Sequence, residues 1–446
     1  MLININFGSR NYTSSDPPIH FVHEPTRRGT VSLATTCITT ISLCVWTAVH
    51  LNIPVPGCYG SLQQKLRKVF LFCVGFLAPE VVAYTAWKQR ITAEKILEHV
   101  PPDKKLPPLG KRITLWCRMV VAKLTCSVLE ESKSTDPHLW TMTHAFYATM
   151  GGFVVQFADD IAGMPTEGHR YTILPDGILR LLNERPIPKP LTELSIDDIN
   201  DKSKSDKLAK FLCIVQVGYF IFQCGTRFRN HLAISILEIN TLGHALCALL
   251  NYFLWWDKPL NVNCATIIRN AKVKEVLLRE SDTTNGQVIE PISTDDSNII
   301  RDKIIGRLCL FVQKAYDEFV KPDEPNHILG AVMTLGLHSF LHLLAWDGSF
   351  RSPEEQFGWQ VASVILMISS FFYVVQAIWS MRVEPMTWKL DCQKGESIAL
   401  GLLIGVVIVL CFLARLFLVA ESFWNLLYLP DEVYDVPEWT GYFPHL

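Results

Sequence analysis

The sequence has almost no net charge, no closely paired cysteines and no leader pattern. Its 446 residues carry 41 Lys and Arg against 43 Asp and Glu, a formal net charge of −2. A chain without a basic excess gives no electrostatic reason to expect a nucleic-acid partner. None of the 13 cysteines stands in a CxxC pair, and many lie inside apolar runs, where a thiol packs as a small apolar group. Residues 1–25 lack a basic stretch followed by an apolar one, so we expect no cleavable signal peptide.

Motifs for phosphate and acyl-transfer chemistry are also missing. No Walker sequence, glycine-rich phosphate loop or GxSxG motif occurs. The segment Asp197–Asp201 matches the DDxxD pattern that holds magnesium diphosphate, but it also begins a helix after Ser195. His338 and His342 have the spacing of two metal ligands on one helix face, yet no glutamate accompanies them. We therefore predict no bound metal, and the sequence identifies no cofactor.

What the sequence does have is long apolar runs, in a chain that is 49% hydrophobic. A helix of roughly twenty apolar residues crosses the core of a bilayer. The runs predict eight spans, or seven if the weakest, Leu139–Val155, only lies at the interface. They are Val31–Leu51, Phe70–Trp87, Leu139–Val155, Phe211–Cys224, Leu232–Trp256, Ile328–Trp346, Trp359–Trp379 and Ser397–Ala420.

The expected fold is therefore all-α, a polytopic membrane helix bundle over residues 30–425. A polar segment, 1–29, precedes the bundle, and an acidic aromatic tail, 426–446, follows it. The large loops 89–138, 158–208 and 256–326 carry helical patterns of their own. These patterns predict a basic amphipathic helix within 101–138, a capped helix at Asp198–Lys210 and a helical pair at Thr266–Leu278 and Asn298–Phe319.

The stretch His231–Val262 stands at the centre of this prediction. It contains no Lys, Arg or Asp between Leu232 and Trp256. Glu238 points to one side of the predicted helix, and a second polar set follows a 4-3-4 spacing on the other side: Asn240, His244, Cys247 and Asn251. Unpaired polar atoms in hydrocarbon cost free energy, so we expect this helix to lie inside the bundle.

Ionisable residues inside the predicted spans are the candidate site. Buried charge is costly, so a carboxyl or histidine at membrane depth is by default a functional hypothesis. We expect Glu80, His244, His338 and His342 to share one polar region, which Gln216 or Gln223 would border. The candidate catalytic residues are Glu80 or Glu238 as a proton donor, with His244, His338 and His342 as partners. The alternative is structural, with each group bonded to a backbone carbonyl across a helix contact.

Several blocks of sequence together resemble a family of fungal multi-pass integral membrane proteins of unassigned function. The resemblance runs from about Pro25 to the eighth apolar run and implies an all-helical membrane fold, but it implies no activity and no site residues. The blocks include Arg27–Thr30, Cys44–Pro54, Leu77–Glu80, Met150–Phe153, Asp201–Asp206 and Trp255–Val262.

Three functions remain open at this point. The first is an intramembrane enzyme that acts on a lipid or isoprenoid-like molecule. The second is a transporter or channel for a small molecule, although no internal repeat and no paired broken helices are evident. The third is a membrane receptor or scaffold. In each case the partner is the lipid bilayer, in an endomembrane such as the endoplasmic reticulum or in the plasma membrane. A tail without Lys or Arg and a glycosylation sequon at Asn11 favour both ends outside the cytosol.

Overall fold

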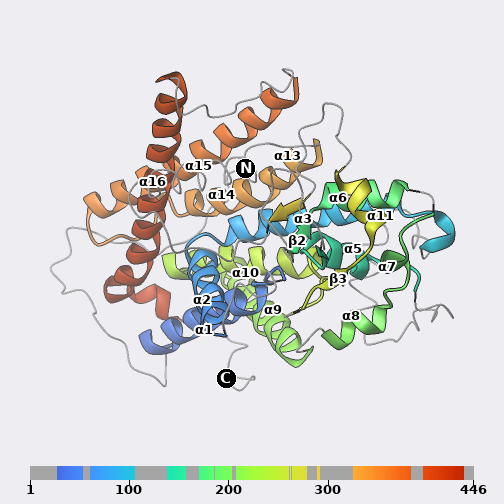
Figure 1. Ribbon diagram of the computed structural model, residues 1–446. Coiled ribbons are helices and arrows are strands. Elements are labelled where there is room, and N and C mark those ends of the chain that lie inside the picture. Colours follow the sequence, from blue (N-terminus) through green and yellow to red (C-terminus); the bar gives the residue numbers. More distant parts are fainter. Residues whose placement is uncertain are drawn as a thin grey trace.

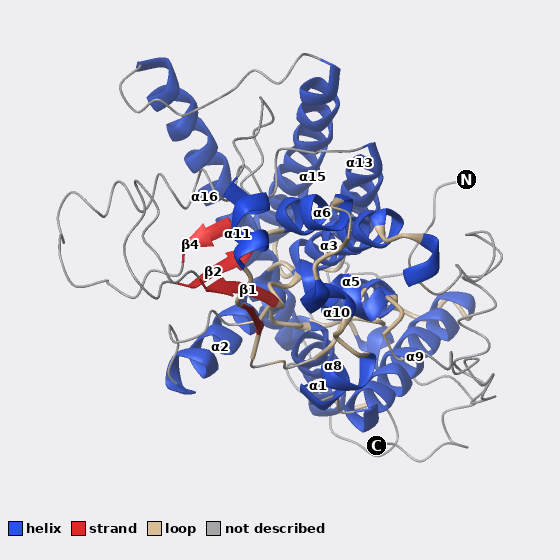
Figure 2. Cartoon of the chain, turned by 45° about the vertical axis from the view of Figure 1, so that its right-hand side comes forward, coloured by secondary structure: helices blue, strands red, loops and turns tan. Residues whose placement is uncertain are grey.

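The computed structural model describes a mostly helical chain with one small sheet (Figures 1 and 2). The sheet corrects the all-α prediction. Long helices form a bundle, and the sheet with its short helices packs at one end of it. The described residues are 28–53, 61–105, 138–156, 170–184, 186–202, 207–260, 262, 264–278, 289–291, 325–382 and 395–435.

The bundle consists of the long helices and the segments that connect directly to them. In chain order these are α1 (Thr30–Ala48), α2 (Ser61–Leu77), α3 (Pro79–His99), α9 (Lys207–Arg229), α10 (Ile236–Leu254), α13 (Pro325–Ala331), η2 (Val332–Gly336), α14 (Leu337–Leu344), α15 (Pro353–Arg382) and α16 (Gly395–Trp424). Short 3-10 turns η3 (Asn425–Tyr428) and η4 (Asp431–Tyr434) follow α16. The backbone N–H of Arg28 donates to Tyr434 O over 3.1 Å, so the first and last described segments meet at the same end of the bundle. We call this the terminal end, and the opposite end the sheet end.

Helix α10 occupies the middle of the bundle, as its polar faces predict. It packs against α1, α3, α9, α14 and α16, and its polar side chains are buried. Ser235 caps its first turn and accepts a hydrogen bond from the backbone N–H of Glu238. The turn from α9 places His231 in the left-handed region, with φ 55°, and makes α9 and α10 antiparallel neighbours.

The predicted second span is broken at Pro79. Helices α2 and α3 meet at an angle of 111°. Proline has no backbone N–H and cannot continue the ladder of α2, so the chain turns at Ala78 and restarts with Pro79 in the first turn of α3. The sequence predicts the position of this break but not its angle.

The prediction of eight spans is wrong for the described chain. Three segments are long and apolar enough to cross a bilayer, namely α1, Phe211–Arg229 of α9 and Gly405–Tyr428, which includes most of α16. A fourth is formed if the bent α2–α3 pair is one span. The helical run Ile328–Leu344 is apolar but shorter. The other predicted runs are interrupted, carry buried polar groups or fold differently.

Leu139–Val155 is the run that folds differently. It forms the short helix α5 (Met142–Thr149), a glycine turn and strand β1 (Phe153–Gln156). Gly151 has φ 86°, and a Cβ on Gly152 would lie 2.3 Å from the Tyr147 ring, so only glycines allow this turn. The run is therefore part of the layer that carries the sheet, and it is not one helix long enough to be a span.

Strand β1 is the second strand in a sheet of order β3-β1-β2-β4. It pairs antiparallel with β2 (Arg170–Ile173) and parallel with β3 (Thr266–Ile268), and β2 pairs with β4 (Ile289–Pro291). Strand β3 and α11 (Ala271–Leu278) replace the single helix predicted at Thr266–Leu278. The remaining helices of the layer are α6 (Pro175–Asn183), α7 (Lys189–Thr192) and α8 (Ile196–Lys202).

Helix α8 begins with the predicted capping box. The backbone N–H of Asp198 donates to Ser195 Oγ over 3.0 Å, and the Ser195 backbone N–H donates to the Asp198 carboxylate over 3.1 Å. These bonds hold the pKa of Asp198 below its usual value. Helix α8 is described from Ile196 to Lys202, and the last residues of the predicted helix, from Lys207 to Lys210, belong to α9; residues 203–206 lie outside the described residues. The helices predicted at Asn298–Phe319 and, beyond Lys105, within 101–138 lie outside the described residues.

We expect this layer to lose stability below pH 6.5 through His144. This histidine is 1% exposed, its Nδ1 accepts from the Thr141 N–H, and its Nε2 donates to Leu194 O. Burial lowers its pKa from 6.5 to about 4. The unfolded chain therefore binds more protons between these two values, and stability falls as the pH falls, by on the order of 2 kcal/mol at pH 5. Thermal unfolding at pH 7.5 and pH 5 measures the loss, and a His144→Gln variant with an unchanged pH slope would contradict this assignment.

Candidate functional site

Four ionisable side chains from three helices lie together in the middle of the bundle. Glu80 comes from the first turn of α3, His244 from the middle of α10, and His338 and His342 from α14. All four are buried, and Glu80 has no exposed surface. We call this group the Glu80–histidine cluster. The structure thus brings together the four residues that the sequence placed in one polar region, while their catalytic role stays a prediction.

The cluster forms a chain of short polar contacts. Glu80 Oε2 lies 3.4 Å from His338 Nε2, and His338 Nε2 lies 3.4 Å from His342 Nε2. The His244 ring meets the His338 ring edge-on with centroids 5.9 Å apart. His338 Nε2 therefore stands between a carboxylate and a second imidazole.

Arg415 is the partner that the sequence did not identify. A long side chain near the end of a span can extend towards the interface, but Arg415 turns inward, forms an ion pair with Glu80 and donates to Leu77 O over 3.3 Å. Its side chain is only 15% exposed. The sequence feature that points to this contact is the position of Arg415, which is a lone arginine in the most apolar run of the chain. A buried carboxyl elsewhere in the bundle is the partner that such an arginine needs.

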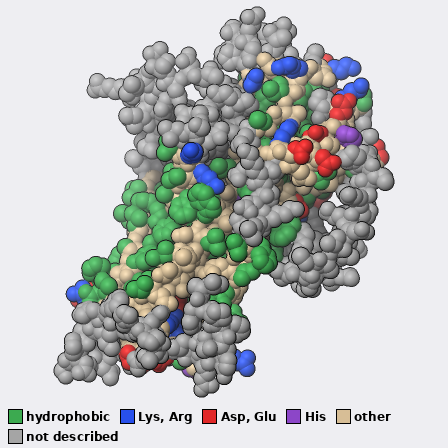
Figure 3. Space-filling view, turned by 90° about the horizontal axis from the view of Figure 1, so that it is seen from below, with side chains coloured by type: hydrophobic (Ala, Val, Ile, Leu, Met, Phe, Trp, Pro, Cys, Tyr) green, Lys and Arg blue, Asp and Glu red, His purple; other side chains and the backbone are tan. Residues whose placement is uncertain are grey.

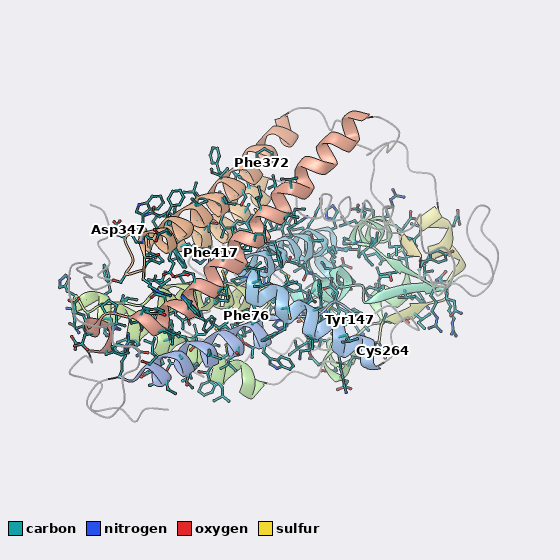
Figure 4. The ribbon with its side chains drawn as sticks, turned by 90° about the vertical axis from the view of Figure 1, so that its left-hand side faces the viewer. Phe76, Tyr147, Cys264, Asp347, Phe372 and Phe417 are labelled. Carbon is teal, nitrogen blue, oxygen red and sulfur yellow. The ribbon has the colours of Figure 1, made fainter. Side chains whose placement is uncertain are left out.

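The broken helix supplies acceptors to the cluster. His244 Nε2 lies 2.8 Å from Phe76 O, and its Nδ1 lies 3.0 Å from Asn240 O. Figure 4 places Phe76 along the bundle between Asp347 at the terminal end and Tyr147 with Cys264 at the sheet end. Both nitrogens of His244 face carbonyl oxygens, yet a neutral imidazole donates through only one of them. The second carbonyl is thus placed to accept a hydrogen bond from the N–H that forms when His244 takes up a proton.

Gly243 makes the approach of α14 to α10 possible. A Cβ at this position would lie 2.9 Å from His338 Nδ1. His338 Nδ1 and His342 Nδ1 are buried and have no hydrogen-bond partner among the described residues. The α10 backbone therefore fixes the His338 ring by close packing, and Nε2 is the nitrogen that contacts Glu80.

A small pocket borders the cluster at Pro79 and His244. It lies between α1, the α2–α3 break and α10, and it has room for about one water molecule. Asn251 and Gly75 also line it.

Glu238 is not part of this cluster. Its carboxylate is bonded to Arg28 Nη2 over 3.0 Å and to the Ser235 N–H over 2.8 Å at the terminal end. Neither predicted glutamine is found at the cluster: Gln216 Nε2 donates to Thr40 Oγ1, and Gln223 Oε1 is a buried atom without a hydrogen-bond partner in the described chain. Within the described ranges no three His, Cys, Asp or Glu side chains are placed to hold a metal ion.

Comparison with known proteins adds a family but no activity. No curated protein and no solved structure matches the chain. A family model matches residues 2–282 and 326–446, which is most of the sequence. The chain belongs to this family, which is described as a family of unknown function (DUF8562).

Proposed function

We propose that this protein is an integral membrane transport protein in which the Glu80–histidine cluster carries protons between the two sides of the membrane. The observation that carries the proposal is the sequence of two 3.4 Å contacts, Glu80–His338 and His338–His342, buried in the middle of the bundle. The His338–His342 contact is a hydrogen bond, whereas the Glu80–His338 contact is at ion-pairing distance and must shorten before a proton passes. Series of carboxylate and imidazole groups at membrane depth mark proton pathways.

The surface of the bundle supports a membrane location. Large apolar side chains are exposed on α1, α2, α9, α14, α15 and α16, among them Phe211, Phe371 and Phe412. Figure 3 shows one face on which apolar side chains cover the middle and charged ones gather towards the ends. A contiguous apolar surface of this kind is unfavourable in water. We propose that α10, α13–α14 and α15 complete the membrane domain around the three segments that are long and apolar enough to cross a bilayer.

The cluster lies at the depth where a transport site is expected. His244 is near the midpoint of α10, which runs from Ile236 to Leu254. Two helix irregularities flank it: the 111° break between α2 and α3, and η2, a π-helical turn that leads into α14. Transporters build midplane sites at discontinuous helices, and π-turns are frequent at functional positions. Pro79 in the sequence predicts the first irregularity, while no residue pattern predicts the π-helical turn η2.

The space around Glu80 favours a proton over a larger substrate. The side chain is 0% exposed and already in contact with Arg415 and His338. The adjoining pocket has room for about one water molecule. A lipid whose reacting group must contact Glu80 finds no such space in the described structure.

Glu80→Gln is expected to abolish proton movement. The amide has almost the same volume but takes up no proton, so the relay to His338 is interrupted. The purified protein is reconstituted in liposomes that contain a pH-sensitive dye, a pH gradient is imposed, and the proton flux is recorded. We expect a loss of about 100-fold or more.

Glu94→Gln is the matched control, because Glu94 lies on the same helix but is partly exposed and pairs with Arg90. Its flux should equal that of the unmodified protein. Because Glu80→Gln also leaves Arg415 without its anionic partner, flux is compared per folded molecule, with folding measured by thermal unfolding of the same preparations. Equal flux per folded molecule in Glu80→Gln and the unmodified protein contradicts the proposal.

An intramembrane enzyme for lipids is the second candidate, and the position of Arg415 favours it. Its side chain is 15% exposed, and Phe412 and Leu416 beside it on α16 face outward. An anionic lipid headgroup could therefore reach this cation from the bilayer. Mass spectrometry of the lipids in the same liposomes distinguishes the two functions: conversion that depends on Glu80, without proton flux, identifies an enzyme.

A further inference from the structure

We infer that the start of α15 and the end of α16, at the terminal end of the bundle, together form a binding site for one hard divalent cation, Ca²⁺ or Mg²⁺. The protein ligands are the carboxylates of Glu355 and Glu421 and the amide oxygen of Asn425. This inference goes beyond the proposed proton transport and does not depend on it. It also departs from the sequence-based expectation of no bound metal, which weighed the histidine pair and the segment Asp197–Asp201.

Two contacts set the register between α15 and α16. One is at Gly358, where an added Cβ would lie 2.7 Å from the Phe417 ring. The other joins the end of α16 to the segment before α15: Asn425 Nδ2 donates to a backbone carbonyl there over 2.7 Å. The two helices are therefore antiparallel. Glu355 stands about one turn before Gly358, and Glu421 about one turn after Phe417, so the two carboxyls lie on facing turns.

Each of the three side chains has a buried oxygen without a partner. Oε2 of Glu355, Oε1 of Glu421 and Oδ1 of Asn425 have no hydrogen-bond partner among the described residues. Glu421 is 6% exposed and Asn425 is 1% exposed. Asn425 follows Glu421 by one turn, and helical side chains lean towards the N-terminus, so the amide leans over the turn that carries the carboxyl. Three acceptors thus meet in one place without a donor.

The charges around Glu421 require a cation. This residue lies in the last turn of α16, where the helix dipole disfavours an anion, and that turn contains no basic residue. The charge that acts on its carboxyl is the like charge of Glu355. Neither glutamate forms an ion pair with a Lys or Arg of the described chain, and Arg351, which precedes α15, lies over the Tyr428 ring instead, at 4.7 Å. A buried carboxylate in this setting needs a positive charge or a proton.

The geometry favours a cation over a shared proton. Two carboxyls that share one proton are hydrogen-bonded to each other at about 2.5–2.7 Å, whereas the unpaired oxygens of Glu355 and Glu421 form no such bond. A cation lies about 2.0–2.6 Å from each of its oxygen ligands, so it bridges oxygens that are too far apart for a hydrogen bond. Carboxylate and amide oxygens are the ligands of Ca²⁺ and Mg²⁺, and two carboxylates balance a divalent charge. Glu355 is partly exposed, which lets the ion enter and lets water complete its coordination.

Calcium and magnesium binding tests the site. The purified full-length protein in detergent is freed of metal with a chelator and titrated calorimetrically with CaCl₂ and, separately, with MgCl₂. At least one of the two ions should saturate the protein and raise its thermal unfolding midpoint. Glu421→Gln removes a charged ligand at nearly constant volume and should weaken this binding by about tenfold or more. Without metal, the same variant should be at least as stable as the unmodified protein, because two like charges no longer repel each other.

Glu354→Gln is the matched control. Glu354 stands in the same first turn of α15 as Glu355, but it is exposed and its carboxylate bonds Ser352. Its cation affinity should equal that of the unmodified protein. Glu355→Gln, at a partly exposed position, should lose affinity as Glu421→Gln does, and it decides the question if Glu421→Gln fails to fold.

No saturable binding of either ion overturns the inference, as does binding that Glu355→Gln retains at full affinity. Proton flux is not measured in this experiment, so its failure leaves the proposed transport function standing. Full flux in Glu80→Gln, in turn, overturns the transport function and leaves the cation site standing.

Discussion

Arg415→Met is expected to destabilise the protein by about 3–5 kcal/mol, because it removes one partner of a buried ion pair. The Glu80 carboxyl would then lie in a site with no exposed surface, and His338 would be its remaining ion-pairing partner among the described residues. Methionine fills a similar volume, so loss of packing contributes little. Thermal unfolding in detergent, or the guanidinium concentration at half-unfolding, measures the change.

A double variant separates charge from packing. Glu80→Gln combined with Arg415→Met removes both charges and should recover most of the stability, because replacing a whole buried pair is often nearly neutral. Arg351→Met is the control: Arg351 is exposed over the Tyr428 ring at 4.7 Å, and its loss should change stability little. An Arg415→Met protein as stable as the unmodified one contradicts the assigned ion pair.

The site was predictable because burial makes charge expensive. Glu80, His244, His338 and His342 stand in runs that must avoid water, and mutual contact is the least costly way to satisfy them. The cost of burial alone does not identify the other residues that contact this cluster. Arg415 has a long side chain that can reach either the interface or the interior, and the sequence does not decide between these conformations.

The sheet could not be predicted from local pattern. Phe153 pairs with Thr266, more than a hundred residues away, and the connection between them includes α6, α8, α9 and α10. Such pairing depends on the whole fold. The run Leu139–Val155 is apolar enough in composition to predict a span. The turn into strand β1 depends on Gly151 and Gly152, and glycine is also frequent in membrane helices, so these residues did not exclude a span.

The count of spans failed because composition does not distinguish lipid-facing from interior helices. The polar residues of α10 keep it below the hydropathy of a span, although it lies at the centre of the bundle. The α2–α3 run is apolar enough but is bent by 111° at Pro79. The same polar residues and the same break that lower the count also build the candidate site.

Glu238 was the alternative candidate for the proton donor, and in the structure its carboxylate belongs to a separate set of hydrogen bonds at the terminal end. Arg28 donates to its carboxylate and also, through Nε, to Val433 O over 2.9 Å. Arg227 donates to the Val433 and Ala233 carbonyls. Glu238 is thus the acceptor that positions Arg28, and Arg28 and Arg227 together hold the segment after α16 against the starts of α1 and α10.

Glu238→Gln is therefore expected to cost about 3–5 kcal/mol of stability while proton flux per folded molecule stays unchanged. The amide leaves Arg28, which is only 9% exposed, without its anionic partner. Ser235→Ala is the matched variant: it removes the cap hydroxyl but keeps the ion pair, and should cost about 1 kcal/mol. Unfolding midpoints and liposome flux are measured on the same preparations. If Glu238→Gln instead loses flux at full stability, Glu238 belongs to the proton path, and the route must extend beyond His342 to the terminal end.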